Sequence, residues 1–324
     1  MKTFAHSAIL AAGFAAANAS PKSFDDPLFV SPTDADGLAP HSTVFFGLGV
    51  FRSSSEGSRN GAAFKAQRQD LGFSSGALVR SENSPLEFRY GLGVSALFGT
   101  SRLNAEGLVS NARAVESEVR ALGIGSLVAT ESVHLGAGFE FMRASIAEGS
   151  ASKASVSGAR PVFGLGLRLA ALTIDFSALF PLEKKKQGQE TDGGEASTAR
   201  LDEPMHLAAK GTWRTSEGFT SGLLLTHTAL ESKGGGRRPT EAEKWAVGAF
   251  AEIAFADGLS LRPLVTSRRL APAGSPLQVW GGSLQGEALT PIGAFTPELG
   301  FSYGKGASAK VSEALCRVSW RALL

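Results

Sequence analysis

Histidine and serine side chains have the clearest catalytic potential in this sequence. His134, His206 and His227 fall in segments with strand-like alternation, but they lack the short spacing of a metal-ligand set. We therefore expect no metal site and no cofactor. Ser221 and the fragment Thr226–Thr228 come nearest to the serine–histidine arrangement of a hydrolase. The alternative is that His227 is a polar side chain in the lumen or at the rim of a closed sheet, in which case the protein is not an enzyme.

Charged residues that alternate with apolar ones form a larger set of candidates. Successive side chains of a strand point to opposite faces, so such a charge lies on the face away from its apolar neighbours. In a membrane barrel this face lines the lumen, where charge tunes selectivity; the alternative is a lattice of structural ion pairs in a closed interior. Both signs occur, so no ion preference is predicted. The lumen-facing candidates are Arg89, Glu140, Arg168, Asp175, Lys210, Arg214, Glu252, Arg317 and Arg321.

The segment Lys244–Phe255, KWAVGAFAEIAF, shows the underlying pattern most clearly. The parity that runs from Trp245 to Phe255 is entirely apolar, whereas the other parity includes Lys244 and Glu252. Such a strand fits a position between lipid and a more polar interior. Trp245 and Phe255 are ten residues apart. At about 3.3 Å per residue and a tilt of about 35–45°, the strand spans the ~25 Å apolar band with an aromatic residue at each end.

The same alternation recurs along the chain and predicts an all-β protein. At ~22–25 residues per strand and turn, residues 20–324 give an antiparallel up-and-down transmembrane β-barrel of about 14 strands, with 12 as the alternative. A soluble β-sandwich would also show alternation, but it needs a second sheet to cover each apolar face. Many of the 39 glycines lie inside strand patterns, where they indicate bending or close backbone approach. Residues 104–122 are ambiguous, because their charges would also suit a helix.

The N-terminal part of the chain differs from the rest. Residues 1–19 resemble a cleaved signal peptide, with Lys2 before a short apolar core and Ala17-Asn18-Ala19 as the cleavage pattern. Residues 20–41 contain four prolines and are expected to form an N-terminal arm or lumenal plug, which leaves 42–324 for the barrel. The net charge of +2 gives no indication of nucleic-acid binding. The single cysteine, Cys316, lies on an apolar parity and is expected to pack as a small hydrophobic residue.

The connections and the C-terminal segment predict an orientation in the outer membrane of a Gram-negative-type bacterium. The polar segments 181–204, 144–160 and 232–243 are expected to be outer loops, and the segments 256–258 and 215–218 to be periplasmic turns. The strand predicted at Cys316–Leu324 would close the sheet and contact the barrel-insertion machinery. Its apolar parity would face the lipid of the outer membrane.

The segments Ser132–Phe141, SVHLGAGFEF, and Val162–Leu169, VFGLGLRL, followed by a strand and a polar loop, resemble the long-chain fatty-acid transporter (FadL-like) family. This resemblance implies a 14-stranded barrel with an N-terminal hatch, which moves hydrophobic molecules passively, often through a lateral opening at a kinked strand. The sequence lacks the Asn-Pro-Ala hatch motif of many members; Asn60-Gly61-Ala62 is the nearest equivalent. No binding residue is carried over.

We therefore predict a passive porin-like channel or transporter for small or hydrophobic solutes. The alternative is a structural or surface-interaction barrel with a closed lumen, and an outer-membrane hydrolase is a third possibility. The sequence does not identify the solute or the oligomeric state.

Overall fold

The computed structural model describes residues 42–59, 62–81, 87–105, 112–148, 152–180, 185–190, 205–215, 219–229, 245–270, 277–306 and 309–323. The predicted signal peptide, 1–19, and the predicted arm or plug, 20–41, lie outside the described residues. Within them, no helix is long and apolar enough to span a bilayer.

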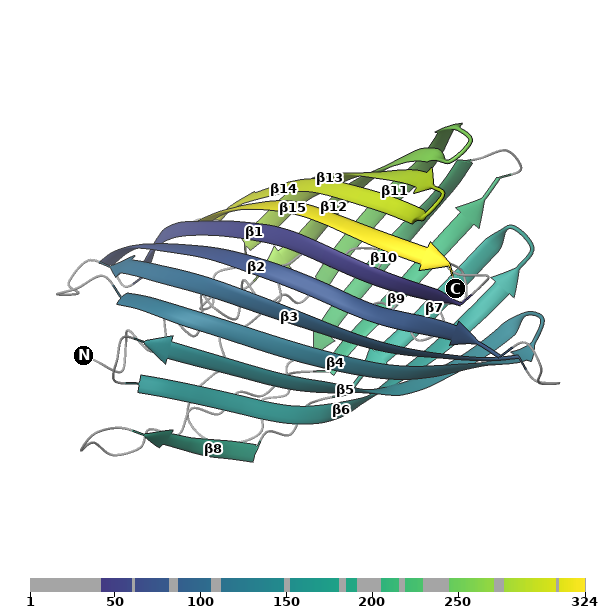
Figure 1. The fold of residues 1–324 in the computed structure, drawn as a ribbon. Coiled ribbons are helices and arrows are strands. Elements are labelled where there is room, and N and C mark those ends of the chain that lie inside the picture. The colour runs from purple at the N-terminus through teal and green to yellow at the C-terminus, as the bar shows by residue number, and fades with distance from the viewer. Residues whose placement is uncertain are drawn as a thin grey trace.

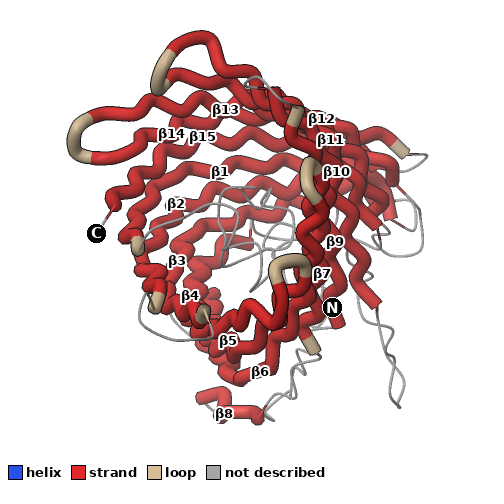
Figure 2. Tube along the Cα trace, turned by 90° about the vertical axis from the view of Figure 1, so that its right-hand side faces the viewer, coloured by secondary structure: helices blue, strands red, loops and turns tan. Residues whose placement is uncertain are grey.

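The described part of the chain forms one antiparallel sheet that closes on itself (Figures 1 and 2). Strands β1–β7 and β9–β15 each pair with the next ring strand, and β1 pairs with β15. β8 is the one strand outside this ring of fourteen. The predicted 14-strand up-and-down barrel is therefore confirmed. The strands are β1 (Thr43–Arg59), β2 (Ala62–Arg80), β3 (Phe88–Ala105), β4 (Ala112–Thr130), β5 (Val133–Glu148), β6 (Ser152–Leu169), β7 (Leu172–Leu179), β8 (Lys185–Glu190), β9 (Met205–Arg214), β10 (Phe219–Ala229), β11 (Trp245–Ala256), β12 (Leu259–Leu270), β13 (Leu277–Thr290), β14 (Gly293–Lys305) and β15 (Ala309–Leu323).

The two ends of the barrel differ in their connections. At the end called here the turn end, only two residues separate β4 from β5, β6 from β7, β11 from β12 and β13 from β14. The turn Asp257-Gly258 has a left-handed glycine, with φ of 79° at Gly258, as tight hairpins of this sequence require. The connection 215–218 is at the same end, so both predicted short turns lie together. The long connections, including 180–204 and 230–244, begin and end at the opposite end, called the loop end.

The outward face of the ring is apolar over most of its height. Alternate residues of the strands are exposed hydrophobic side chains, and those of the other parity are mostly buried or half-buried. On β11, for example, Trp245, Val247, Ile253 and Phe255 are exposed, whereas Phe250 is buried. A band of this extent is stable against lipid rather than water.

Three predicted segment assignments need correction. Residues 144–160 are mostly strand, because β5 continues to Glu148 and β6 begins at Ser152. Residues 112–122 belong to β4, so the helical alternative for this segment is wrong. The polar segment 181–204 contains β8, which pairs with Lys153–Ser157 of β6. β7 ends at Leu179, and β8 covers the stretch of β6 beyond it, which would otherwise be an open sheet edge.

Glycines make room for large side chains that lie flat on the inner wall. Phe45 of β1 faces Gly76 of β2 in the register. A Cβ on Gly76 would lie 2.5 Å from the Phe45 ring and 2.5 Å from the Leu92 carbonyl oxygen. By contrast, a Cβ on Gly211 would meet no atom within 4 Å.

We predict that Gly76→Ala destabilises the folded barrel by about 1–3 kcal/mol, because the backbone of β3 would have to move. Gly211→Ala is the matched control, and it should leave stability unchanged or slightly raised. Denaturant titration of the refolded protein in detergent micelles measures both. Equal stability of the two variants would contradict this account of Gly76.

Candidate functional site

The interior of the barrel is the candidate functional site, and ion pairs line one part of its wall. On β2, Arg68 donates to Asp70 (2.7 Å) and its guanidinium reaches Glu116 of β4 (2.6 Å). Ser101 of β3 donates a further hydrogen bond to Glu116 (2.8 Å). All four side chains are buried. Three adjacent strands are therefore tied together by charge-assisted bonds on their inner face.

A second group of pairs continues this lattice onto the next strands. Glu140 of β5 accepts from Arg120 of β4 (3.1 Å) and from Arg160 of β6, and Arg120 also donates to Glu118. The side chains of Glu140 and Arg160 are 4% and 5% exposed. Because the lattice is buried, substitution of one charged residue should destabilise the barrel: its partners would stay buried without a compensating charge.

Further ion pairs are distributed around the other strands. They are Arg168–Asp175 (2.8 Å), Arg262–Glu252 (2.6 Å), Arg317–Glu298 (3.7 Å), Arg321–Glu287 (3.3 Å) and Arg268–Glu313. Carboxylates and guanidinium groups therefore alternate over the inner wall, and their charges nearly cancel.

The nine predicted candidates all lie on the parity opposite the exposed apolar side chains. Glu140, Arg168, Asp175, Glu252, Arg317 and Arg321 take part in the pairs above. Lys210 is buried and faces Asp175 in the register of β7 and β9. Arg214 is exposed at the turn end.

Arg89, the remaining candidate, lies at the turn end of β3. It donates to Glu87, and Arg80 approaches the same carboxylate (2.9 Å). The hydrogen bond from Arg89 and the charges of both arginines lower the pKa of Glu87 below its usual range. This cluster links the last residue of β2 to Glu87, the residue before β3.

Several interior charges were missed at the sequence level. Arg120 and Arg160 fell in segments assigned as ambiguous or as a loop, so their parity was not read. Arg68, Asp70 and Glu116 lie on long strands beyond the clearest apolar alternation. The missed residues of the lattice are Arg68, Asp70, Glu116, Glu118, Arg120, Arg160, Arg262, Arg268, Glu287, Glu298 and Glu313.

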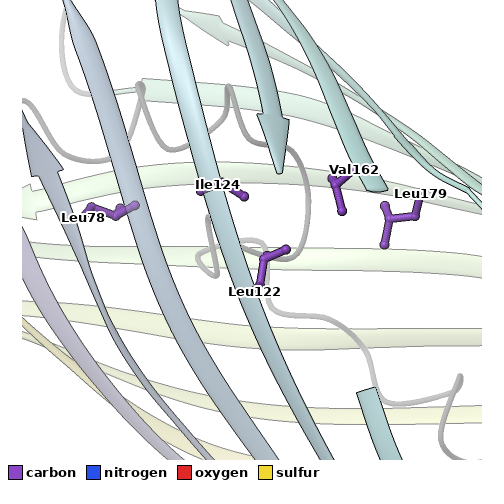
Figure 3. Packing of buried hydrophobic residues seen from close by; sticks show 5 residues of the cluster. All are labelled: Leu78, Leu122, Ile124, Val162 and Leu179. Atoms are coloured by element: carbon purple, nitrogen blue, oxygen red, sulfur yellow. The ribbon is translucent and has the colours of Figure 1, made fainter. Parts of the chain in front are cut away.

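An apolar row crosses the same inner wall. Leu78, Leu122, Ile124, Val162 and Leu179 are buried and packed as one cluster, with Phe45 against it (Figure 3). The register links Leu78 to Gly91, Gly91 to Ile124, Ile124 to Gly138, Gly138 to Val162 and Val162 to Leu179. Large side chains thus alternate with glycines from β2 to β6, and Leu179 of β7 follows Val162 directly. The row adds a buried apolar layer to the inner wall beside the charged lattice.

The hydrogen-bond ladder is interrupted at two proline positions. Pairing of β11 with β12 stops between Phe250↔Leu264 and Ile253↔Leu261, next to Pro263. Pairing of β13 with β14 stops between Gln285↔Glu298 and Ala288↔Phe295, next to Pro297. Proline has no N–H to donate, so it breaks a ladder. β3, by contrast, pairs without interruption from Arg80↔Arg89 to Phe64↔Ala105.

The serine–histidine arrangement considered for a hydrolase is wrong for this structure. His227 lies on the outward face and stacks on Trp245, with ring centroids 4.1 Å apart. Ser221 is six residues away on the same strand, roughly 20 Å at ~3.3 Å per residue. The description of His227 as a lumen side chain is also wrong, and the rim alternative fits its position near the loop end. Among the described residues, no group of three or more His, Cys, Asp or Glu could hold a metal ion.

Comparisons with known proteins identify the architecture. The chain matches no protein-family model and no curated protein by sequence. Its structure is similar to that of a Pseudomonas aeruginosa FadL homologue, with a TM-score of 0.70, 12% identity and coverage of 92% of this chain and 94% of that chain. The Pseudomonas putida toluene transporter TodX gives a TM-score of 0.62 at 13% identity, with 93% and 94% coverage. The Ralstonia pickettii toluene transporter TbuX gives 0.61 at 10% identity, with the same coverage.

These similarities confirm the expected resemblance to the FadL-like proteins at the level of the fold. They extend over almost the whole length of both partners. Two of these three structures are those of toluene transporters. At 10–13% identity the likeness concerns the barrel itself.

We predict that Glu140→Ala destabilises the barrel by about 3–5 kcal/mol, since Arg120 and Arg160 would lose a buried partner. Glu56→Ala is the control: Glu56 pairs with Lys65 on the outer surface, where both side chains are about half exposed (51% and 48%), so its loss should cost at most about 1 kcal/mol. Denaturant titration in micelles distinguishes the two variants. If Glu140→Ala lowers the free energy of unfolding no more than Glu56→Ala does, the buried ion pairs do not stabilise the barrel.

Proposed function

We propose that this protein is a passive channel of a bacterial outer membrane that carries small hydrophobic solutes. The proposal depends chiefly on one observation, the apolar row inside the barrel. A water-filled pore has a polar inner wall, and a barrel that only filled its lumen with ion pairs would not need such a row. The row lies beside the lattice, so an apolar layer of the wall adjoins charges that already neutralise each other.

Three features support the membrane location. The outward band is apolar, four of the six connections at one end are two residues long, and the two longest connections lie at the opposite end, as in outer-membrane barrels. The turn end would then face the periplasm and the loop end the cell exterior. Two of the proteins of similar fold named above are toluene transporters, and toluene is a hydrophobic solute. No step of this function requires covalent chemistry, so we propose that the protein is not an enzyme.

The path of the solute is expected to follow the apolar row rather than the ion pairs. An apolar molecule gains free energy on contact with Leu122, Ile124 and Val162, whereas it cannot replace the hydrogen bonds of Glu140 or Arg160. The nine predicted charges then serve mainly to stabilise the wall beside this path. Selectivity for the solute depends more on the shape and polarity of the apolar row than on these charges.

We predict that the double variant L122N/I124N lowers uptake about tenfold, because a polar amide in an apolar path costs roughly 1–3 kcal/mol. The measurement is uptake of labelled toluene, the probe, by Gram-negative cells that express the chain and lack other hydrocarbon channels. The matched control L122I/I124L keeps both volumes and polarity, and its uptake should equal that of the parent. Folding of each variant is checked by the heat-dependent mobility of the barrel in gels. Undiminished uptake by a folded L122N/I124N barrel would rule out this path.

A second candidate function is a structural or surface-interaction barrel with a closed lumen. The lattice of buried ion pairs on β2–β6 favours it, because such pairs fill space and fix the wall. Under this proposal the active part is the loop end, including β8.

Replacing Lys184–Glu195 by a Gly/Ser linker of equal length distinguishes the two functions. If the protein is a channel, toluene uptake should persist at close to the parental rate. If it is an interaction barrel, cells that express the linker variant should no longer bind other cells or surfaces. The parent protein should then show no toluene uptake. A single adhesion and uptake assay on the same cells gives both readouts.

A further inference from the structure

Charge on the outward face of the barrel is distributed very differently from charge inside it. Of the described side chains on ring strands, Glu56 is the one outward carboxylate. Against it stand seven exposed outward cations: Arg52, Lys65, Arg102, Arg143, Arg269, Lys305 and Lys310. No described strand position on the outward face near the turn end carries a charge. The outward surface is therefore cationic at the loop end alone.

Five of these cations gather on neighbouring strands and form what we call the cationic patch: Arg52, Lys65, Arg102, Lys305 and Lys310. Register pairing places Lys305 of β14 opposite Lys310 of β15, Lys310 opposite Glu56 of β1, and Glu56 opposite Lys65 of β2. Lys65 in turn faces Asn104 of β3. These strands lie side by side in Figure 1. At about 4.8 Å per strand, the row spans roughly 19 Å.

Arg52 and Arg102 extend the patch toward the apolar band. Arg52 is two residues beyond the exposed Val50 on β1, and Arg102 is four residues beyond the exposed Phe98 on β3. On β14, Lys305 follows the exposed Tyr303 in the same way. Two to four residues correspond to about 7–13 Å along a strand, measured from the exposed apolar residue to the cation. The cations therefore lie at the level of the boundary between the acyl chains and the headgroups.

Among the described strand residues, the patch carries more positive charge than outward carboxylates neutralise. Lys65 pairs with Glu56 (2.6 Å), which is the only outward carboxylate available among the described strand residues. Lys305 and Lys310 are direct cross-strand neighbours, an arrangement of like charges that destabilises a sheet. An anion that bridges the two ammonium groups would turn this repulsion into attraction.

We propose that the cationic patch binds the phosphate groups of a glycolipid in the outer leaflet, while the acyl chains lie on the apolar band below. The proposal rests on the outer-membrane location given above but not on the solute. Several phosphates on one headgroup match several cations within roughly 19 Å, and the adjacent apolar side chains match the acyl chains. A zwitterionic phospholipid has one phosphate with a compensating cation, so it fits the patch less well.

The test is a binding titration of the purified full chain in a neutral detergent, followed by native mass spectrometry. The probe is bis-phosphorylated lipid A, and the same glycolipid after enzymatic removal of both phosphates is its comparison. We expect the phosphorylated form to bind at least tenfold more tightly. Equal affinity for the two forms would overturn the proposal, and this arm requires no variant.

Two matched double variants then locate the site. K305Q/K310Q removes two charges from the patch, and R143Q/R269Q removes two exposed outward charges elsewhere on the barrel. At about fivefold per charge, K305Q/K310Q should weaken lipid A binding roughly 25-fold, with little effect of R143Q/R269Q. Equal losses would show unspecific charge attraction and would contradict a defined patch.

The single variant K305Q should change the apparent melting temperature in opposite directions with and without the lipid. In detergent alone it should raise this temperature, because it relieves the repulsion from Lys310. With saturating lipid A it should lower this temperature relative to the parent. A decrease in both conditions would contradict the role assigned to this lysine pair. Toluene uptake, measured separately, distinguishes failure of this proposal from failure of the proposed channel function.

Discussion

The pairing of β1 with β15 closes the sheet, and the remaining organisation of the molecule depends on this closure. The register runs from Thr43↔Leu323 to Gly57↔Ala309, so both strands are hydrogen-bonded along nearly their whole length. In lipid, an unpaired strand edge would leave polar backbone groups without partners. Closure also fixes which parity faces inward on every strand. The outer apolar band, the inner ion pairs and the inner apolar row are three consequences of that single choice.

The interior combines two kinds of packing that usually compete. Buried ion pairs need partners at fixed positions, and apolar side chains need volume. Glycine resolves the conflict locally: Ile124 lies across Gly138, and Phe45 lies across Gly76, so large side chains fit without spreading the strands. The charged and apolar parts of the wall can then occupy the same strands at different heights. A buried apolar cluster is thereby kept in the wall of a barrel whose interior ion pairs nearly cancel in charge.

Alternation in the sequence was sufficient for the strands that cross the apolar band, such as Trp245–Ala256, and for some of their inward charges. It was insufficient where strands extend past that band. On β5, Arg143 and Ser145 occupy the outward positions that Phe139 and Phe141 occupy nearer the turn end. The segment therefore reads as a polar loop although it is hydrogen-bonded strand. The partners of Arg120, Arg160 and Arg268 depend on register between strands, which a single sequence does not encode locally. β8 is a similar case, since only the early end of β7 creates an edge for it to cover.

The proline positions on β12 and β14 have a mechanical consequence. β12 and β13 are paired continuously from Leu259↔Ala288 to Leu270↔Leu277, yet the ladder pairing of each with its other neighbour is interrupted at a similar level. The hydrogen-bond ladder between β12 and β13 is thus more complete than the ladders that join this pair to β11 and β14. Under thermal or lateral stress the two strands should move together as one unit. Amide hydrogens next to Pro263 and Pro297 should therefore exchange before those between β12 and β13.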